Sequence, residues 1–404
     1  MKKEPIAVGR PSLLRRTNAL TILNLLREAG SCSRADLVRA SGMSAPTVTN
    51  VVSDLLAANL IKPLGEGESS GGRPPDIIRF KAERGCILGV QISAHTLFFL
   101  LTDLSGEELD TAQVSLRGRK TDPEAICGLI VEELRQLFKK HKKAREQLLA
   151  LVVGVPAITN VEEGIVLSVS TLENWRSVPL RRMLSKHVDC RIIIENDTNL
   201  AALGERHRGA ARTEATFVLI DIGANVSAGI VLDGKVHHGA QWSAGEIAYF
   251  RLPRILRKQP VLHEFGELEA VLTSSGILKS WNEAIAKSRR TSTPATDDMD
   301  ASGVLNLAQD GDPLARKLIV SRAAIVADVI VNLSLVLNPG LILLGGKVGS
   351  NPVLLSFVNK ELENSEFAIP KIAAASLGDF AVLWGAISLA LEAIPSLLLP
   401  ASIT

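Results

Sequence analysis

The sequence has few cysteines, and their spacing gives no structural pattern. The four cysteines, at positions 32, 86, 127 and 190, lie far apart and form no CxxC pair. Disulfide frameworks and zinc clusters both need cysteines in closer or paired spacing. The sequence therefore predicts neither kind of site.

We expect neither a signal peptide nor a membrane span from the apolar residues of this sequence. Its start, MKKEPIAVGRPSLLRR, contains no apolar signal core. Asp328, Asn332 and Pro339 interrupt one of the two most apolar stretches, and Glu392 and Pro395 interrupt the other. These interruptions favour buried core elements over membrane spans. We therefore expect a cytoplasmic protein that makes no membrane contact.

Net charge is small, but it is unevenly distributed. The 404 residues carry a formal net charge of +2, and a chain of this length is expected to form two or three domains. Residues 1–80 hold 11 Lys and Arg against 7 Asp and Glu, a net charge of +4, which leaves −2 for the rest. A basic N-terminal part favours contact with nucleic acid. Charge alone also fits an ordinary small domain.

Residues 20–60 carry the apolar pattern and the capping residues of three short helices. Leucine and isoleucine at positions 20–26 form one helical face. Ser33 caps a second predicted helix, SRADLVRASG, and Ser44 caps a third, SAPTVTNVVSDLLAANL. Gly42 makes the turn between them, as in a helix-turn-helix, in which the last helix enters the DNA major groove. A generic three-helix bundle is the alternative that this pattern leaves open.

The third predicted helix carries short polar side chains near its start, and these are the expected DNA contacts. Short side chains bring the backbone close to DNA and can hydrogen-bond to bases or phosphates. Arg34, at the start of the second helix, is expected to contact a phosphate. The other predicted DNA contacts are Ser44, Thr47, Thr49 and Asn50.

The next segment, residues 64–80, reads LGEGESSGGRPPDIIRF. Its apolar ends are expected to pair as a small wing around a Gly, Ser and Pro loop. Arg73 lies between glycines and prolines, where an extended backbone can deliver one guanidinium into a narrow minor groove. A flexible linker is the alternative interpretation, and one segment can serve both purposes.

Two segments of the remaining chain share one pattern, about 130 residues apart. They are LGVQISAHTLFFLLTDLSGE at 88–107 and FVLIDIGANVSAGIVLDGKV at 217–236. Each contains an apolar strand, a turn of small residues, a second apolar strand and a hairpin turn with Asp and Gly. This spacing predicts a duplicated α/β domain, as in the actin-like sugar kinases, whose two halves face a cleft.

The chain resembles the ROK family of repressors and sugar kinases over nearly its whole length. Residues 1–80 resemble the DNA-binding extension of the repressor branch, including its GGRPP segment. The motifs that carry the resemblance in the body are GVPAI (154–158), LENW (172–175), IIIENDTNLAALGE (192–205), IVLDGKVHHGA (230–240), AGEIAY (244–249), LEA (268–270), LNPGLILLGG (337–346) and LGDFAVLWGA (377–386).

The resemblance implies an α/β fold in three parts. A winged helix-turn-helix domain with its GGRPP linker is expected at 1–80, followed by a two-lobed actin-like body of the sugar kinase and ribonuclease H type. The first lobe is expected at 81–200 and the second at 201–404. The C-terminal helix either stays with the second lobe or returns to the first.

The resemblance also shows what the chain has lost relative to the family kinases. Their first phosphate turn resembles DIGGTK, but residues 91–96 read QISAHT. Their second turn resembles GTGIGGGI, but residues 223–230 read GANVSAGI. Phosphoryl transfer depends on positioning the phosphates and neutralising their charge, which these turns would provide. We therefore expect no catalysis and no bound cofactor. Gly345 and Gly346, which match positions near adenosine, leave open a diverged but working ATP site.

The sugar-binding positions of the family are better retained. Asp197, in ENDTN, matches the catalytic base that would take a proton from a sugar hydroxyl. A structural alternative is that Asp197 or Thr198 caps the helix that continues to Leu203. The other residues that match sugar-site positions are Asn174, Asn196, Glu246, Tyr249 and Glu269.

The resemblance implies that no metal is bound. The family usually has a zinc-ligating histidine where Tyr249 stands, and a CxCGxxGC pattern follows, but residues 250–270 contain only His263. A tetrahedral zinc site needs about four N or S ligands. His237 and His238 are expected to be a surface or pocket-lining pair. The loop is expected to be held by packing of Phe250, Leu252, Leu262 and Phe265.

Together these patterns predict a transcriptional regulator, a repressor of carbohydrate uptake or catabolism genes. Its expected partners are a double-stranded DNA operator, a sugar or sugar-derivative effector or a protein effector, and a second copy in a homodimer or homotetramer. The alternative function is an active ROK sugar kinase. The sequence does not identify the effector or the operator.

Overall fold

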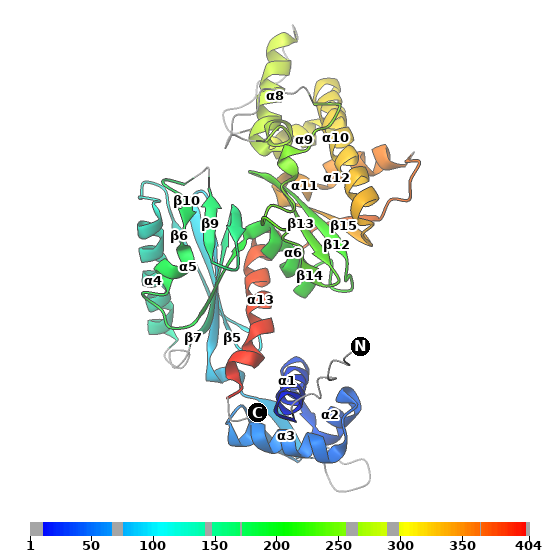
Figure 1. Cartoon of the computed structure of the whole chain (residues 1–404). Coiled ribbons are helices and arrows are strands. Elements are labelled where there is room, and N and C mark those ends of the chain that lie inside the picture. The colour runs from blue at the N-terminus through cyan, green and yellow to red at the C-terminus, as the bar shows by residue number, and fades with distance from the viewer. Residues whose placement is uncertain are drawn as a thin grey trace, which may run out of the picture.

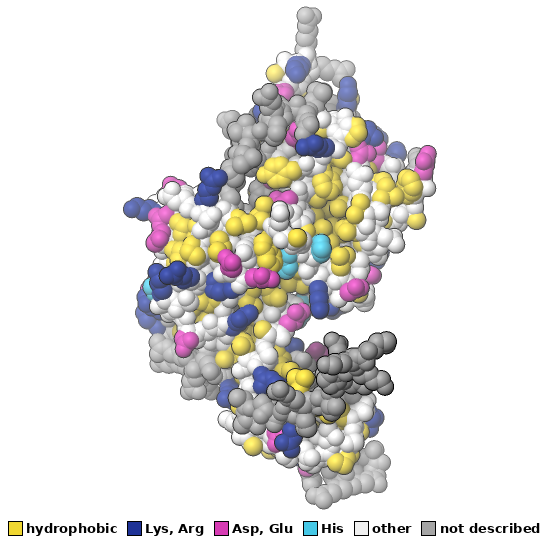
Figure 2. Space-filling view, in the orientation of Figure 1, with side chains coloured by type: hydrophobic (Ala, Val, Ile, Leu, Met, Phe, Trp, Pro, Cys, Tyr) yellow, Lys and Arg dark blue, Asp and Glu magenta, His cyan; other side chains and the backbone are white. Residues whose placement is uncertain are grey.

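The computed structural model describes residues 11–66, 76–141, 148–169, 172–255, 266–288, 299–363 and 365–400. It has three parts: a small head, a first lobe and a second lobe (Figure 1). The head lies at one end of the first lobe, away from helices α8 to α12 of the second lobe. Acidic and basic side chains are interspersed over the face shown in Figure 2.

The head consists of the described part of residues 11–80. Its three helices pack around Leu26, Leu37, Val48 and Leu55, which are fully buried. Apolar burial of this kind is the main source of stability in so small a unit. The elements are α1 (Pro11–Ala29), β1 (Ser31–Ser33), α2 (Arg34–Ser41), α3 (Ala45–Ala57), β2 (Ile61–Glu66) and β3 (Asp76–Phe80).

Side-chain caps define the ends of the head helices, as the sequence predicts. The Ser33 hydroxyl accepts from the Asp36 N–H, while the Asp36 carboxylate accepts from the Ser33 N–H at 2.8 Å. This reciprocal capping box satisfies two N–H groups at the start of α2. Gly42 ends α2 at φ +68°, a backbone conformation that favours glycine. The Ser44 hydroxyl accepts from Thr47 at the start of α3.

The predicted wing is confirmed in the paired strands. β2 and β3 are antiparallel, and β1 pairs with the other edge of β3. The wing therefore lies beside the helix-turn-helix in one small unit. Arg73 and the GGRPP segment fall outside the described residues.

The first lobe contains a five-stranded sheet of order β11-β7-β4-β5-β6. β6, β5 and β4 are antiparallel, whereas β4, β7 and β11 run parallel. The buried side of α4 forms a separate apolar cluster with one face of this sheet. The elements are β4 (Cys86–Ile92), β5 (Thr96–Asp103), β6 (Glu108–Ser115), α4 (Pro123–Lys140), β7 (Leu148–Val155), β8 (Ile158–Asn160), β9 (Ile165–Ser168), β10 (Arg176–Val178), α5 (Leu180–Leu184) and β11 (Arg191–Asn196).

The second lobe repeats the same sheet plan, with order β14-β13-β12-β15-β16. β14, β13 and β12 are antiparallel, and β12, β15 and β16 run parallel. This equivalence confirms the duplication predicted from the two similar segments. The elements are β12 (Phe217–Ile222), β13 (Val226–Leu232), β14 (Lys235–Val236), α7 (Glu269–Leu272), α8 (Ser274–Lys287), α9 (Ala301–Gln309), α10 (Pro313–Leu337), β15 (Leu341–Gly345), α11 (Gly346–Gly349), α12 (Pro352–Leu362) and β16 (Lys371–Ala374).

Two helices, α6 (Asp197–His207) and α13 (Ala381–Leu398), cross between the lobes (Figure 1). They meet backbone to backbone because both carry glycine at the crossing. A Cβ on Gly204 would lie 2.1 Å from the Ala381 carbonyl oxygen, and one on Gly385 would lie 1.7 Å from that of Leu200. The predicted lobe boundary at 200/201 falls inside α6, because this helix runs from Asp197 to His207.

The C-terminal helix α13 packs on the sheet of the first lobe, against β4, β5 and β7. One continuous apolar core joins the head, α6, α13 and one face of each sheet. α10 and α13 are each long and apolar enough to cross a membrane by length and composition alone. Here both helices contribute to buried cores.

Candidate functional site

The exposed side of α3 carries the predicted DNA contacts. Thr49 and Asn50 are exposed, opposite the buried side of the helix. Ser44 and Thr47 bond to each other through their hydroxyl oxygens at 2.8 Å, so both hydroxyls already have a partner within the head. Arg34 forms an ion pair of 3.2 Å with Asp76 of the wing. A phosphate contact by Arg34 would therefore compete with this local partner.

The two phosphate-type turns of the body are closed by their own hydrogen bonds. Ser93 donates its N–H and its hydroxyl to the Thr96 carbonyl, at 3.0 and 2.8 Å. In the second turn, the Gly223 N–H donates to the Asn225 carbonyl at 3.0 Å, and the Val226 N–H donates to Glu269 at 3.3 Å. A phosphate cradle needs free N–H groups. In these turns the N–H groups of Ser93, Thr96, Gly223 and Val226 are held in internal contacts.

The repeated sheets place Gln91 and Asp221 at equivalent positions. Gln91 is paired in register with Gly154 of the neighbouring parallel strand, as Asp221 is with Gly345. The first turn thus carries an amide where the second carries an acid. The Oε1 atom of Gln91 is buried without a hydrogen-bond partner among the described residues. Asp221 was not among the predicted site residues. The internal repeat could have identified it, because Asp221 occupies the position in the second segment that Gln91 occupies in the first.

Four carboxylates from different elements come together between the lobes. Asp197 begins α6, Asp221 is the penultimate residue of β12, Glu246 is the last residue of the AGE segment (244–246) and Glu269 begins α7. Burial, with the charges of Asp221 and Glu246, raises the pKa of Asp197 to about 7. Burial and the Glu269 charge raise the pKa of Glu246 to about 7, and burial raises that of Asp221 to about 6. Each acid therefore gains from a hydrogen-bond donor or from protonation.

Glu269 and Asn196 have structural contacts of their own. Glu269 accepts from the Gly266 N–H at 2.8 Å as well as from Val226. The side-chain Oδ1 atom of Asn196 accepts from the Asn199 N–H, and its Nδ2 atom donates to the Ala157 backbone carbonyl, both at 3.1 Å. Asn196 is thus the cap of α6, and the prediction that Asp197 or Thr198 caps it was wrong. The reason is geometric, because Asn196 is the last extended residue before the helix.

Asn174 and Tyr249 are both exposed. Asn174 has a left-handed backbone, φ +61°, in a loop that Trp175 anchors by donating to the Thr121 carbonyl at 2.7 Å. Tyr249 is 58% exposed. Burial and the charges of Glu269 and Glu246 raise the pKa of its phenol. Tyr249 therefore lies near these two carboxylates.

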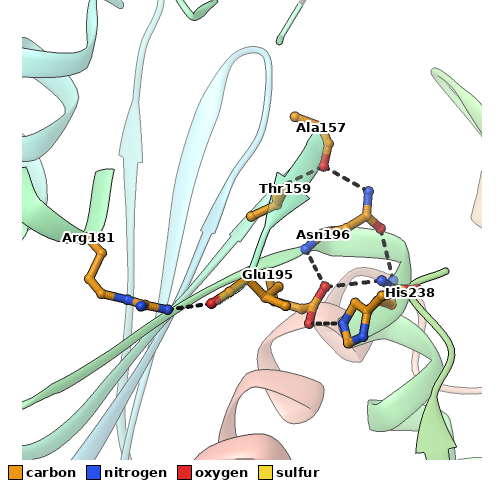
Figure 3. Close-up of polar contacts among 8 residues, drawn as sticks. Ala157, Thr159, Arg181, Glu195, Asn196 and His238 are labelled. Carbon is orange, nitrogen blue, oxygen red and sulfur yellow. Dashed lines mark hydrogen bonds and ion pairs between the residues drawn. The ribbon is translucent and has the colours of Figure 1, made fainter. Parts of the chain in front are cut away.

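His238 makes a contact that the sequence did not predict (Figure 3). Its Nε2 atom lies 2.7 Å from Oε2 of Glu195, which is almost fully buried. The neighbouring His237 is exposed, as expected of a surface residue. Among the described residues no group of three His, Cys, Asp or Glu could hold a metal ion. His263, Leu262 and Phe265 lie outside them, while Leu252 is buried and Phe250 packs against the second-lobe core.

Comparisons with known proteins support this organisation. A family model described as "ROK family" matches residues 87–393, and one described as "Winged helix-turn-helix DNA-binding" matches residues 15–62. The chain is 25% identical over 398 residues to the xylose repressor of Caldicellulosiruptor bescii, covering 95% of this chain and 98% of that protein. It is 26% identical over 292 residues to a glucokinase of Halalkalibacterium halodurans, covering 71% and 87%.

A solved structure extends the comparison to the fold. The crystal structure of a ROK family transcriptional regulator, a homologue of the Escherichia coli Mlc protein, matches with a TM-score of 0.80 at 24% identity. The match covers 95% of this chain and 98% of that structure, so the three-part fold, head included, is shared. The family model alone spans most of the chain. This chain, a winged helix-turn-helix joined to a two-lobed body, belongs to the ROK family.

Proposed function

We propose that the protein is a cytoplasmic DNA-binding transcriptional regulator that represses genes of carbohydrate uptake or catabolism. The observation that carries this proposal is the union of a winged helix-turn-helix head with a sugar-kinase-like body whose two phosphate turns read QISAHT and GANVSAGI in place of the kinase motifs. The xylose repressor named above matches the chain along almost its whole length. Its name gives the regulatory class that we propose here, and xylose is one candidate effector.

The state of the two turns argues against phosphoryl transfer. Transfer requires N–H donors and cations arranged around the phosphates. The first turn has an amide, Gln91, in place of the acid, and the Ser93 N–H is already bonded to Thr96. We therefore propose that the body binds an effector without converting it.

The cluster of four carboxylates described above supports an effector with several hydroxyl groups. An ionised carboxylate accepts hydrogen bonds from two vicinal hydroxyls, and an acid with a raised pKa gains most from such donors. Asp197 from α6 and Glu246 from the second lobe are close enough for Glu246 to act on the pKa of Asp197. A sugar bound between them would contact both lobes at once. It would therefore prefer one arrangement of the lobes.

Helices α6 and α13 offer a route from this site to the head. α6 begins at Asp197 and is about 16 Å long at the usual helical rise. It crosses α13 in backbone contact, and the far end of α13 lies against α1. There the Arg16 guanidinium donates to the Ser396 carbonyl at 3.2 Å. A ligand that shifts α6 would thus change how the head sits, and its differential affinity for the two states would set the size of the response.

We propose that the functional form is a homodimer or a homotetramer. A winged helix-turn-helix reads a half-site, and two-fold symmetric proteins match palindromic operators. Two heads carried on paired bodies would bind DNA with a spacing set by the bodies. An effector that changes head placement would then change operator affinity.

The testing experiment measures the thermal midpoint of the purified protein with xylose, glucose, amino-sugars, their phosphates and Mg–ATP. A shift with one sugar and none with Mg–ATP supports an effector-gated regulator. Asp197→Asn and Glu246→Gln should abolish that shift while operator binding, measured by fluorescence anisotropy, is retained. A shift with Mg–ATP together with ATP turnover would favour the kinase instead. Silence across the panel would favour a protein effector.

A further inference from the structure

A buried contact joins the lobes next to the proposed effector site (Figure 3). Glu195 belongs to β11 of the first lobe, and His238 follows β14 of the second. Their side chains meet at 2.7 Å, with 4% and 26% of the side chains exposed. A carboxylate this deeply buried needs donors on both oxygens. His238 is the donor that comes from the other lobe.

The other oxygen of Glu195 is bound to the start of α6. Its Oε1 atom accepts from the Asn196 N–H at 2.8 Å and from the Asn199 side-chain amide at 3.0 Å. Asn196 in turn caps α6 and bonds to Ala157. The carboxylate of Glu195 therefore fixes the first turn of the helix, where Asp197 stands.

The loop of the second lobe that contains His238 and Glu246 (residues 237–249) is also organised around His238. The His238 carbonyl accepts from the Ala244 N–H at 3.1 Å, two residues before Glu246. The imidazole meets the Trp242 indole edge-on, with ring centres 5.5 Å apart. Trp242 has φ +63°, a conformation that is costly for a bulky residue. The loop thus holds a strained tryptophan against the histidine.

The electrostatics of the pair favour a charged contact. Burial lowers the pKa of His238, but the hydrogen bond and the charge of Glu195 outweigh it, so the pKa is raised overall. A protonated imidazole donates to a carboxylate more strongly than a neutral one. Glu195 is the charged group that acts on the imidazole.

We propose that His238 is a positioning residue of the effector site, which acts through Glu195 to hold the Glu246 loop against the first turn of α6. The contact between His238 and Glu195 thereby holds Asp197 and Glu246 where one ligand can reach both. This inference rests on the proposed function for the identity of that ligand, but the contact itself can be tested without one. Neither His238 nor Glu195 needs to touch the effector.

The test is hydrogen exchange of the full-length protein, followed in peptides that cover residues 195–203 and 237–249. We expect His238→Ala to raise exchange about tenfold in both peptides, since one contact holds both segments. His238→Gln should restore most of the protection, because glutamine keeps a donor for Glu195 but loses the ring contact with Trp242. His237→Ala, the matched control on the exposed neighbour, should leave both peptides unchanged.

Two results would overturn the proposal. One is faster exchange in the 237–249 peptide alone, which would make His238 a packing residue of its own loop. The other is equal exchange in the glutamine and alanine variants, which would assign the effect to the ring. In Glu195→Ala, which removes the carboxylate that accepts in this contact, adding His238→Ala should cause no further increase. If no sugar in the panel binds the wild-type protein, the proposed function fails, while the exchange result still decides the role of His238.

Discussion

Replacing Glu205 with glutamine should loosen the tie between α6 and the segment that leads into α13. Glu205 is fully buried near the end of α6. Its Oε1 atom accepts from the N–H groups of Ser376 and Leu377, both at 2.8 Å. Its Oε2 atom accepts from the Ala210 N–H at 2.7 Å and from the Ser376 hydroxyl at 3.0 Å. All these donors point at one carboxylate.

The expected loss follows from these partners. Glutamine replaces one acceptor oxygen with an NH₂ group, which only donates. With NH₂ at the Oε2 position, the hydroxyl can turn to accept, but the Ala210 N–H loses its partner. A buried donor without a partner costs about 1–3 kcal/mol, and the remaining bonds fall from charge-assisted to neutral strength. We expect a decrease of about 2–4 kcal/mol in the free energy of unfolding.

The assay is urea unfolding followed by far-ultraviolet circular dichroism. The transition midpoint of the body is compared between the wild-type protein and the Glu205→Gln variant. Ser376→Ala is the matched control, since it removes only the hydroxyl and leaves three backbone donors in place. It should decrease the free energy of unfolding by about 1 kcal/mol. A Glu205→Gln protein within about 0.5 kcal/mol of wild type would refute the reasoning, because the carboxylate would then not hold the segment.

The remaining predictions concern DNA affinity, helix crossing and pH. Asn50→Ala should weaken operator binding about tenfold in fluorescence anisotropy without changing the thermal midpoint, and unchanged affinity would remove α3 from the interface. Gly385→Ala places a Cβ 1.7 Å from the Leu200 carbonyl oxygen. The thermal midpoint should therefore fall by several degrees, because overpacking a protein core costs about 1–3 kcal/mol. Burial and neighbouring acids raise the pKa of Asp197 and Glu246 to about 7, so the folded state holds more protons than the unfolded one between about pH 4 and 7. The thermal midpoint should therefore fall as pH rises through this window, and Asp197→Asn should flatten the fall; an unchanged slope in the variant would contradict the assignment.

Local chemistry explains what the sequence determined by itself. Ser33, Gly42 and Ser44 act on residues within one helical turn, so their caps can be predicted without knowing the rest of the chain. The wing and the duplicated hairpins follow from short apolar segments separated by turn residues. The loss of the first-turn acid at Gln91 also needs only the motif.

Only the tertiary structure decided the contacts between residues far apart in the chain. Glu205 and Ser376 are 171 residues apart, and Glu195 and His238 are 43 residues apart. The sequence shows each as a polar residue, but not which partner the fold supplies. A motif pattern could not separate Asn196 as the cap from Asp197 as the first helical residue, because either side chain can cap a helix. The path of the backbone made that choice, because Asn196 is the last extended residue before α6. Glu195 and Glu205, by contrast, are buried, and a buried polar group is stable only when the folded chain brings it a partner.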